Sequence, residues 1–296
     1  MSCALSYAYY PGCSSTGTSV EYDMSSRAIC AALDIKLSDV PDWSCCGSTP
    51  AHTVDHTLSS ALSARNLSQV AAMGLTAAVT PCPSCLSNLR TAQHRMKNDS
   101  FRQKVSKLLD RPADITVETK SVLQILVEDC GVDRIREKVT RPLTGLVVAA
   151  YYGCIMNRPA EIMNFDDREH PMAMDNIMAA LGATVVPFPL KVECCGASFG
   201  IPRRDVVMRL SGKLLDTAKE MGAMALVTAC PLCQMNLDMR QEQINSANGS
   251  QHHMPIFYFT QLMGLAFGLS EKELGIDKLC VNPRTVIDAL VEGQPL

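Results

Sequence analysis

The chain has few aromatic residues, no excess of charge of either sign and no long apolar run. Aromatics make up 5% of its 296 residues, and the formal net charge is −3. We find no basic stripe of the kind that nucleic-acid binding requires, so nucleic acid is not an expected partner. No window approaches about 18 consecutive apolar residues, so no transmembrane segment is expected. No signal peptide is expected either, because the short apolar stretch after Met1 has no basic n-region and is broken by Pro11 and Gly12.

Cysteine, in contrast, is abundant, with 14 residues. Disulfide frameworks belong to small secreted chains whose cores are inadequate. This chain has 47% apolar residues and is long enough to fold around its own cores. Thiols in the cytoplasm stay reduced, and clustered cysteines there are usually metal-binding or catalytic. We therefore expect a cytoplasmic protein whose cysteines bind metal.

Three blocks of sequence occur twice. Residues 74–85, ending in Cys-Pro-Ser-Cys, resemble residues 222–233, ending in Cys-Pro-Leu-Cys; the Cys-Cys-Gly at 45–47 recurs at 194–196; and the Tyr-Pro-Gly-Cys at 10–13 resembles the Tyr-Tyr-Gly-Cys at 151–154. The blocks keep their order at offsets of 141, 149 and 148 residues (154 − 13, 194 − 45 and 230 − 82). This regularity predicts a tandem duplication of a unit of roughly 145 residues. We expect a first domain over residues 1–143 and a second over residues 144–296.

Within each unit, short apolar strands alternate with helical segments. The expected strands are residues 5–10, 76–80, 146–152 and 224–228, and the expected helices are residues 19–33, 57–73, 173–181 and 205–221. Residues 103–142 are predicted to be helical and polar, and to close the first unit. The alternation predicts an α/β fold with a parallel sheet in each unit. Ligands of such sheets gather at the carboxyl ends of the strands, where four of the cysteines lie.

Each unit offers a lone cysteine at a strand end, a vicinal pair followed by glycine, and a Cys-Pro-x-Cys that opens a helix. Exposed amides and the positive dipole end at a helix start lower the pKa of thiols and hold negative charge. Five converging thiolates exceed the four ligands of tetrahedral zinc, so each set predicts an iron–sulfur centre. The ten candidate ligands are Cys13, Cys45, Cys46, Cys82 and Cys85 in the first set, and Cys154, Cys194, Cys195, Cys230 and Cys233 in the second.

Two other interpretations of these cysteines remain open. A structural zinc site could use four of the five cysteines of a set. A thioredoxin-like dithiol at each Cys-x-x-Cys would leave three further cysteines per unit unexplained. The four remaining cysteines have no counterpart in the other unit, and we assign them no role: Cys3, Cys30, Cys130 and Cys280.

On these motifs the sequence resembles the cysteine-rich CCG domain family, and its two complete copies resemble the B subunit of heterodisulfide reductase. The resemblance covers nearly the whole chain and implies two Rossmann-like CCG domains related by a pseudo-twofold axis. It also implies that each set of five cysteines holds a noncubane [4Fe-4S] cluster, and that the two clusters face one another across a substrate pocket. Each cluster could then bind one sulfur of a small disulfide and donate one electron, so that the disulfide is reduced to two thiols. The reaction could also run in the reverse direction.

The sequence contains neither the conventional ferredoxin motif nor a dinucleotide-binding fingerprint, so electrons must come from elsewhere. The resemblance implies that a ferredoxin-like C subunit donates them, and that a flavin-containing A subunit precedes it in the electron path. A competing hypothesis is a non-catalytic electron-transfer or anchoring subunit of another oxidoreductase complex.

Three polar residues near the vicinal pairs are weaker candidates. His52 follows the first pair and could protonate a departing thiolate. Arg203 and Arg204 follow the second pair and could hold a substrate carboxylate or phosphate. The simpler interpretation is a histidine at a helix start and a solvated basic pair.

Overall fold

Two parallel sheets of identical topology organise the chain. The structure, a computed structural model, describes residues 5–48 and 50–292. One sheet has the order β2-β1-β3-β4 and the other β6-β5-β7-β8, and all pairings are parallel. The strands are β1 Ser6–Tyr9, β2 Lys36–Asp39, β3 Ala77–Thr80, β4 Glu118–Ser121, β5 Val147–Tyr151, β6 Thr184–Val186, β7 Ala225–Thr228 and β8 Ile256–Tyr258. The predicted α/β class and duplication are confirmed, and the domain boundary after residue 143 stays a prediction.

The helices follow the same repeat. The four predicted helical segments correspond to α2, α4, α10 and α11, with ends that differ by at most one residue. The first unit contains α1 Gly12–Ser15, α2 Val20–Ala32, α3 Pro50–Val54, α4 His56–Ala72, α5 Pro83–Arg95, α6 Asp99–Ser106, α7 Val122–Gln124, the π-helix η1 Ile125–Cys130 and α8 Val132–Glu137. The second contains α9 Ala160–Met163, α10 Ala173–Ala180, η2 Ala197–Phe199, α11 Arg204–Glu220, α12 Pro231–Leu237, α13 Gln241–Asn248, α14 Phe259–Ala266, η3 Ile276–Lys278 and α15 Arg284–Glu292.

The prediction that residues 103–142 are helical and polar is wrong in part. The segment contains β4, which pairs in parallel with β3 along its whole length. After β4 the chain is apolar, and the side chains of Val122, Leu123 and Leu126 are completely buried. The prediction failed because β4 reads Glu-Thr-Lys-Ser, which has none of the apolar residues that usually mark a strand.

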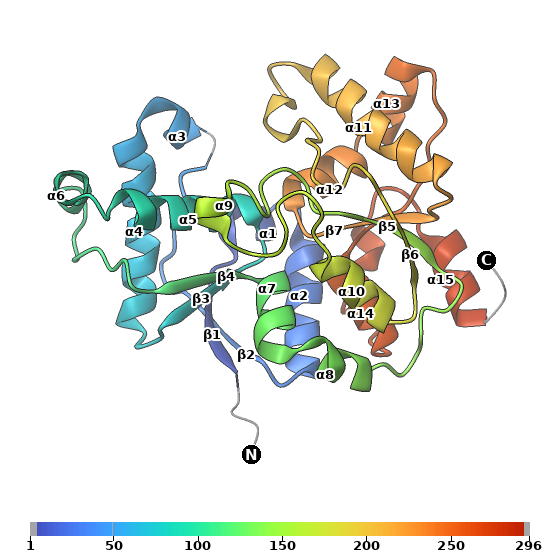
Figure 1. The fold of residues 1–296 in the computed structure, drawn as a ribbon, viewed down its shortest axis with the longest axis horizontal. Coiled ribbons are helices and arrows are strands. Elements are labelled where there is room, and N and C mark those ends of the chain that lie inside the picture. Colours follow the sequence, from blue (N-terminus) through green and yellow to red (C-terminus); the bar gives the residue numbers. More distant parts are fainter. Residues whose placement is uncertain (1–4, 49, 293–296) are drawn as a thin grey trace.

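The two units pack against each other through reciprocal contacts between helices. The helix that follows the first strand of each unit packs on the helix that follows the last strand of the other: α2 contacts α14, and α10 contacts α7 and α8. Figure 1 shows these helices between the two sheets. This reciprocal arrangement is what a pseudo-twofold axis between duplicated units produces.

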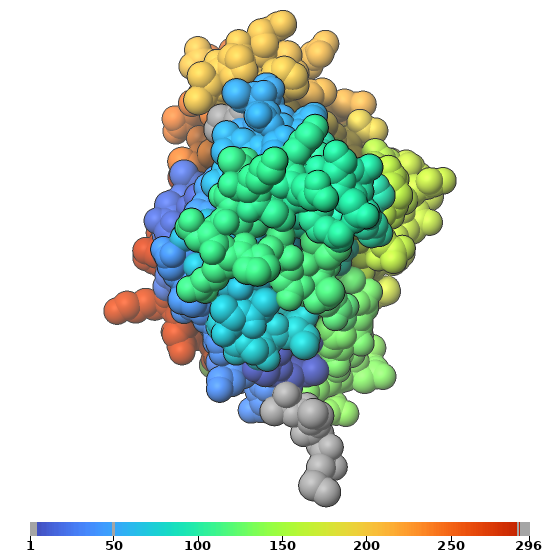
Figure 2. Space-filling model, turned by 90° about the vertical axis from the view of Figure 1, so that its left-hand side faces the viewer, coloured from blue at the N-terminus to red at the C-terminus, as the bar shows by residue number. Residues whose placement is uncertain are grey.

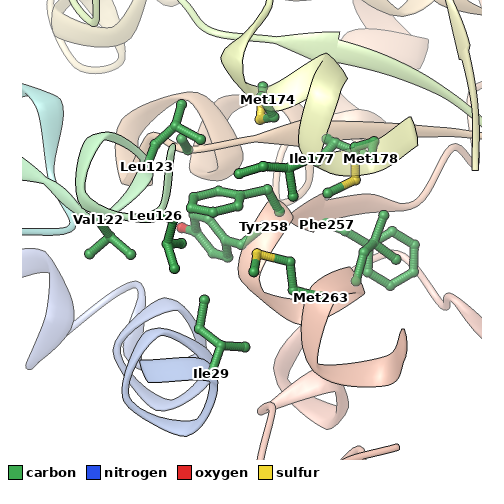
Figure 3. Packing of buried hydrophobic residues seen from close by; sticks show 14 of the residues in the cluster. Ile29, Val122, Leu123, Leu126, Met174, Ile177, Met178, Phe257, Tyr258 and Met263 are labelled. Carbon is green, nitrogen blue, oxygen red and sulfur yellow. The ribbon is translucent and has the colours of Figure 1, made fainter. Parts of the chain in front are cut away.

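The seam between the units is a single apolar core. Figure 3 shows Ile29 and Leu126 of the first unit against Met174 and Tyr258 of the second, and these belong to one buried cluster. The helices at the seam repeat each other in sequence: residues 29–33 read Ile-Cys-Ala-Ala-Leu, and residues 177–181 read Ile-Met-Ala-Ala-Leu. Because one core serves both units, the relative position of their strand ends is fixed by packing.

Candidate functional site

In each unit three of the five cysteines follow the carboxyl ends of the two central strands, and the vicinal pair follows the edge strand β2 or β6. Cys13 lies in α1 directly after β1, and Cys82 follows β3 as the N-cap of α5. In the second unit Cys154 follows β5, and Cys230 is the N-cap of α12 after β7. The predicted strand-end positions are therefore confirmed. The proline after each N-cap cysteine occupies the first helical turn, where its missing N–H costs little.

The thiols within a set contact one another. In the first unit the Cys46 thiol is hydrogen-bonded to Cys45 and Cys85, and Cys85 also to Cys82. In the second unit Cys195 Sγ lies 3.7 Å from Cys233 Sγ. Cys233 is also hydrogen-bonded to Cys230, and Cys154 to Cys194. The predicted sets are thus brought together as two separate groups, in which Cys13 lies near enough to Cys45 to raise the pKa of that thiol but forms none of these hydrogen bonds.

None of the cysteines that the structure describes forms a disulfide. In the first set Cys46, Cys82 and Cys85 are buried, whereas Cys13 and Cys45 are exposed. In the second set Cys195, Cys230 and Cys233 are buried, Cys194 is half-buried and Cys154 is exposed. Over residues 5–48 and 50–292, no three Cys, His, Asp or Glu side chains are grouped as ligands of one metal ion.

Hydrogen bonding divides the thiols of each set into easily and poorly ionised groups. Two hydrogen bonds, one from Cys45 with the larger effect and one from Cys85, lower the pKa of the Cys46 thiol to about 3. A hydrogen bond from Cys154 lowers the pKa of Cys194 to about 6. The pKa of Cys233 is raised, first by its hydrogen bond to Cys195. Thiolates are the form that binds metal, so the lowered pKa of one vicinal cysteine in each set suits metal binding.

Glycine at two matched positions leaves the space beside the thiols open. A Cβ atom on Gly12 would lie 2.9 Å from Cys85 Sγ, and one on Gly153 would lie 2.9 Å from Cys233 Sγ. Both glycines have positive φ, +73° and +74°. We call the place between each glycine and the buried thiol beside it the cradle, because any side chain at the glycine position would fill it. Together with five thiols per set, this cradle fits an iron–sulfur cluster.

The glycine after each vicinal pair has a different role. Gly47 and Gly196 have φ of +83° and +84°, in the left-handed region that favours glycine. A Cβ on Gly47 would lie 3.0 Å from the backbone of Ser59, and one on Gly196 would lie 3.1 Å from the backbone of Val207. These glycines let the vicinal cysteines pack closely on the helices α4 and α11.

Sequence reasoning missed a set of side chains that fix the cysteine loops. Asn88 Nδ2 donates to the Cys46 carbonyl at 3.1 Å and lies 3.9 Å from its sulfur. Asn236 Nδ2 lies 3.5 Å from the Cys195 carbonyl and 3.6 Å from its sulfur. The signal was present in the duplication, because the two asparagines lie at matched places after the Cys-Pro-x-Cys motifs.

Serine and tyrosine side chains repeat in the same way. Two serines donate to the carbonyl of the second vicinal cysteine: Ser63 at 2.8 Å and Ser211 at 3.0 Å. Two tyrosines, Tyr10 and Tyr151, each donate at 2.7 Å to the carbonyl of the residue before the vicinal pair. The loops that carry Cys45–Cys46 and Cys194–Cys195 are therefore held by equivalent hydrogen bonds.

Tyr22 links the two sets of cysteines. This tyrosine belongs to the first unit, and its hydroxyl donates at 3.2 Å to the carbonyl of Ala229, the residue before Cys230. Burial raises its pKa, and the nearby Cys230 and Cys82 thiols, one from each set, raise it further. Its ring stacks on Tyr258 with centroids 4.0 Å apart. The two strand-end sites are therefore neighbours across the seam.

A buried ion pair supports the second site. Lys191 Nζ donates to Asp175 Oδ1 at 2.6 Å, and the two side chains are only 9% and 6% exposed. Tyr152 Oη donates to the other carboxylate oxygen at 2.7 Å. The Lys191 carbonyl accepts hydrogen bonds from the amides of Tyr152 and Gly153, directly before Cys154. The pair thus ties two cysteine-bearing segments together.

Asp175→Ala is expected to destabilise the protein by about 3–5 kcal/mol, because it leaves the Lys191 ammonium buried without its partner. Urea unfolding followed by circular dichroism measures the loss. Asp205→Ala is the control, since its salt bridge with Arg203 is exposed and should leave the unfolding midpoint unchanged. Equal midpoints for the two variants would contradict a supporting role of the buried pair.

The weaker candidates lie on the surface. His52 is exposed in α3, and Arg203 and Arg204 are exposed at the start of α11. Arg203 forms a bidentate pair with Asp205, at 3.0 and 2.8 Å. In Figure 2 the blue α3 segment and the gold segment of the second unit lie at the same end of the molecule. The roles suggested for these three residues stay predictions.

One cysteine of the second set opens on a cavity. Cys154 lines an open cavity of about 570 Å³ together with Arg158, Glu161 and Arg168. Arg158 pairs with Glu169 at the same cavity.

In the part of the chain that the structure describes, no helix is both long and apolar enough to cross a membrane.

Comparison with known proteins agrees with this architecture. The profile of a cysteine-rich domain, CCG, matches residues 7–90 and 148–238. The chain is 35% identical over 289 residues to the 8-methylmenaquinol:fumarate reductase membrane anchor subunit of Wolinella succinogenes, covering 97% of this chain and 99% of that protein. It is 30% identical over 260 residues to the B subunit of the ferredoxin:CoB-CoM heterodisulfide reductase of Methanosarcina mazei, covering 84% of this chain and 85% of that protein. A hypothetical protein from Helicobacter pylori shares the fold, with a TM-score of 0.74 at 12% identity over 93% of this chain and 52% of that one.

Proposed function

Because this chain belongs to the cysteine-rich CCG domain family, with one copy of the domain in each unit, we propose that each set of five cysteines holds a noncubane [4Fe-4S] cluster. We further propose that the chain is the catalytic subunit of a cytoplasmic, heterodisulfide-reductase-like complex. A small disulfide is reduced there to two thiols, with two electrons and two protons consumed as the S–S bond breaks. Two partners, one ferredoxin-like and one flavin-containing, would supply the electrons.

The pairing of the two sites is the observation that carries this proposal. A disulfide takes two electrons, and each bound cluster would supply one. The chain contributes two matched sets of cysteines, and Tyr22 donates a hydrogen bond directly before Cys230 of one set while thiols of both sets, Cys82 and Cys230, raise its pKa. The shared core holds the two sets at a fixed separation, so that both can act on one small molecule. The exposed Cys154 and the cavity beside it support access of that molecule from solvent.

The reaction can be tested on the cluster-loaded, reduced chain without its partners. CoB-CoM heterodisulfide and glutathione disulfide serve as probes, and released thiol is measured together with the electron paramagnetic resonance spectrum. We expect one probe to release two thiols per molecule and to change the spectrum. If neither probe does either, disulfide reduction by this chain is wrong.

A second candidate function is a non-catalytic electron-transfer or anchoring subunit. It is favoured by the relative from W. succinogenes, which is matched over nearly its whole length and is named a membrane anchor subunit. This alternative keeps both clusters but predicts that no disulfide perturbs the spectrum. A redox partner would instead reoxidise the reduced clusters.

Asn236→Leu is expected to weaken the second cluster and to make its reduction potential more negative, because a hydrogen bond to the Cys195 sulfur is lost. Loss of such a supporting partner costs about 10–100-fold in metal affinity. The measurement is a redox titration with cluster retention under chelator. Asn88→Leu is the matched control and should act only on the first cluster; a change in both clusters by either variant would contradict the assignment.

A further inference from the structure

Glu21 places a carboxyl group inside the seam between the two units. It lies in the first turn of α2, directly before Tyr22, and is only 5% exposed. The segment after α14 covers it, since a Cβ on Gly275 would lie 2.8 Å from the Glu21 Cα. Burial, with a smaller contribution from the nearby Asp238 carboxylate, raises the pKa of Glu21 to about 7. A carboxyl group with such a pKa can both hold and release a proton at neutral pH.

A second buried carboxyl group lies between Glu21 and solvent. Asp238 is 2% exposed, and its carboxylate accepts hydrogen bonds from the backbone amides of Cys280 at 2.8 Å and Val281 at 3.0 Å. Burial raises its pKa as well. Asp238 lines an open cavity of about 540 Å³ together with Cys280, whose side chain is exposed. Protons can therefore reach the two carboxyl groups from this cavity.

Two hydroxyl groups connect Glu21 with the second set of cysteines. Tyr258 is completely buried at the seam (Figure 3). Burial raises its pKa, and Glu21 and Cys230 raise it further because both are close to its hydroxyl. The Ser19 hydroxyl is also near it. Among the residues that the structure describes, no well-aligned hydrogen bond fixes the Ser19 or Tyr258 hydroxyl. A hydroxyl that can rotate accepts a proton on one side and donates one on the other.

The other charged and titratable groups that face Glu21 are few in the part of the chain that the structure describes. Lys278 of η3 lowers the pKa of Glu21, against the effect of Asp238. The Cys280 thiol is close enough to Glu21 for the carboxylate to raise its pKa, although burial of that thiol has the larger effect. Burial and the second carboxyl group therefore decide the protonation of Glu21.

The first site differs at the matched position. Arg90 stands five residues after the second cysteine of its Cys-Pro-x-Cys motif, where the second unit has Asp238. The first set also has two exposed thiols, Cys13 and Cys45, whereas in the second set only Cys154 is exposed. The second site is thus the more enclosed of the two, and it has the greater need of an internal path for protons.

From this arrangement we propose that Glu21 delivers the proton that the second site consumes when a disulfide is reduced. Two electrons break the S–S bond and leave two thiolates. The thiolate at the second site takes the hydroxyl proton of Tyr258, which regains a proton from Glu21 through the Ser19 hydroxyl. Solvent then reprotonates Glu21 through the cavity and Asp238. This delivery rests on the proposed function, whereas storage of a proton on Glu21 does not.

Storage of the proton is tested without any disulfide. Infrared spectra of the oxidised, cluster-loaded chain should contain the C=O band of a protonated carboxyl group that is present below about pH 7 and disappears above it. Glu21→Gln should lack this band. Glu137→Gln is the control, because Glu137 is exposed in α8, and it should retain the band. A band that persists in Glu21→Gln, or that titrates well below neutral pH in the unmodified chain, would overturn the proposal.

Delivery of the proton is tested by the pH dependence of thiol release in a single turnover. In the unmodified chain and in Glu137→Gln the rate should be constant below about pH 7 and fall about tenfold per pH unit above it, since only protonated Glu21 donates. Glu21→Gln should be about 100-fold slower at acidic pH and lose this dependence, with its iron content unchanged. Tyr258→Phe should be equally slow but keep the carboxyl band, because it removes only the hydroxyl.

The same experiment separates two kinds of failure. If the unmodified chain releases no thiol from any disulfide, the proposed function is wrong and proton delivery is wrong with it. If the unmodified chain is active and Glu21→Gln has the same rate and pH profile, the proposed function stands and the role of Glu21 alone is wrong.

Discussion

Gly153→Ala is expected to abolish the second cluster while leaving the first in place. The new Cβ would lie 2.9 Å from the Cys233 sulfur, a distance that real Cβ contacts essentially never show. The thiol is buried and hydrogen-bonded to Cys195 and Cys230, so moving away from the new Cβ would take its sulfur out of the set. Iron content should therefore fall by about half after anaerobic loading. Gly12→Ala, whose Cβ would meet Cys85 at the same distance, should do the same to the first cluster.

The control for this prediction separates steric overlap from backbone strain. Gly222 has φ of +75°, almost the same as the +74° of Gly153, but a Cβ there would meet nothing within 4 Å. Gly222→Ala should cost only the backbone penalty of about 1–2 kcal/mol and keep both clusters. Gly74 is the equivalent control for Gly12. Full iron content in Gly153→Ala would show that the cradle is not part of the cluster site.

Cys46→Ser and Cys195→Ser are each expected to reduce the rate of disulfide reduction by at least about 100-fold. Loss of a mere supporting partner already costs up to about 100-fold in metal affinity, and these residues are proposed ligands. Both cysteines are buried at matched places, and both are held by an asparagine and a serine. The measurement is thiol release under single-turnover conditions, with iron content determined on the same samples.

The two serine variants together test whether the sites act as a pair. Each variant should retain the spectrum of the cluster that it does not touch. Cys280→Ser is the control, because Cys280 is exposed and lies outside both sets, and it should have the activity of the unmodified chain. If one of the two vicinal variants reduces the disulfide normally, the two-sided mechanism is wrong and the electron-transfer alternative is favoured.

Much of the fold was predictable because the same pattern of strands, helices and cysteines occurs in both units, so that each unit supports the interpretation of the other. The central strands β1, β3, β5 and β7 are short apolar runs, and they were found from sequence. The outer strands were not: β2 reads Lys-Leu-Ser-Asp and β4 reads Glu-Thr-Lys-Ser, which lack an apolar signal. The outer strands of the second unit, β6 Thr-Val-Val and β8 Ile-Phe-Tyr, are apolar but only three residues long. In β4, Lys120 is nevertheless 8% exposed, because Asp129 holds its ammonium at 2.7 Å.

The candidate site was predictable only where the chemistry is carried by cysteine. The ten thiols were found because their types and spacing repeat. Asn88, Ser63 and their counterparts were missed, since a single polar residue in a helix has many common roles. Tyr22 and the Lys191–Asp175 pair were beyond reach, because they depend on contacts between segments far apart in the chain, as with Tyr22 and Ala229.

The most direct test of two matched iron–sulfur sites is analysis of iron, acid-labile sulfide and zinc in the chain purified and reconstituted without oxygen. Two [4Fe-4S] clusters require about eight iron and eight sulfide per chain, with no stoichiometric zinc. The unmodified chain should reach these values, and Gly153→Ala should reach about half of them. Stoichiometric zinc without sulfide would contradict the presence of clusters and identify the two sets of cysteines as structural zinc sites.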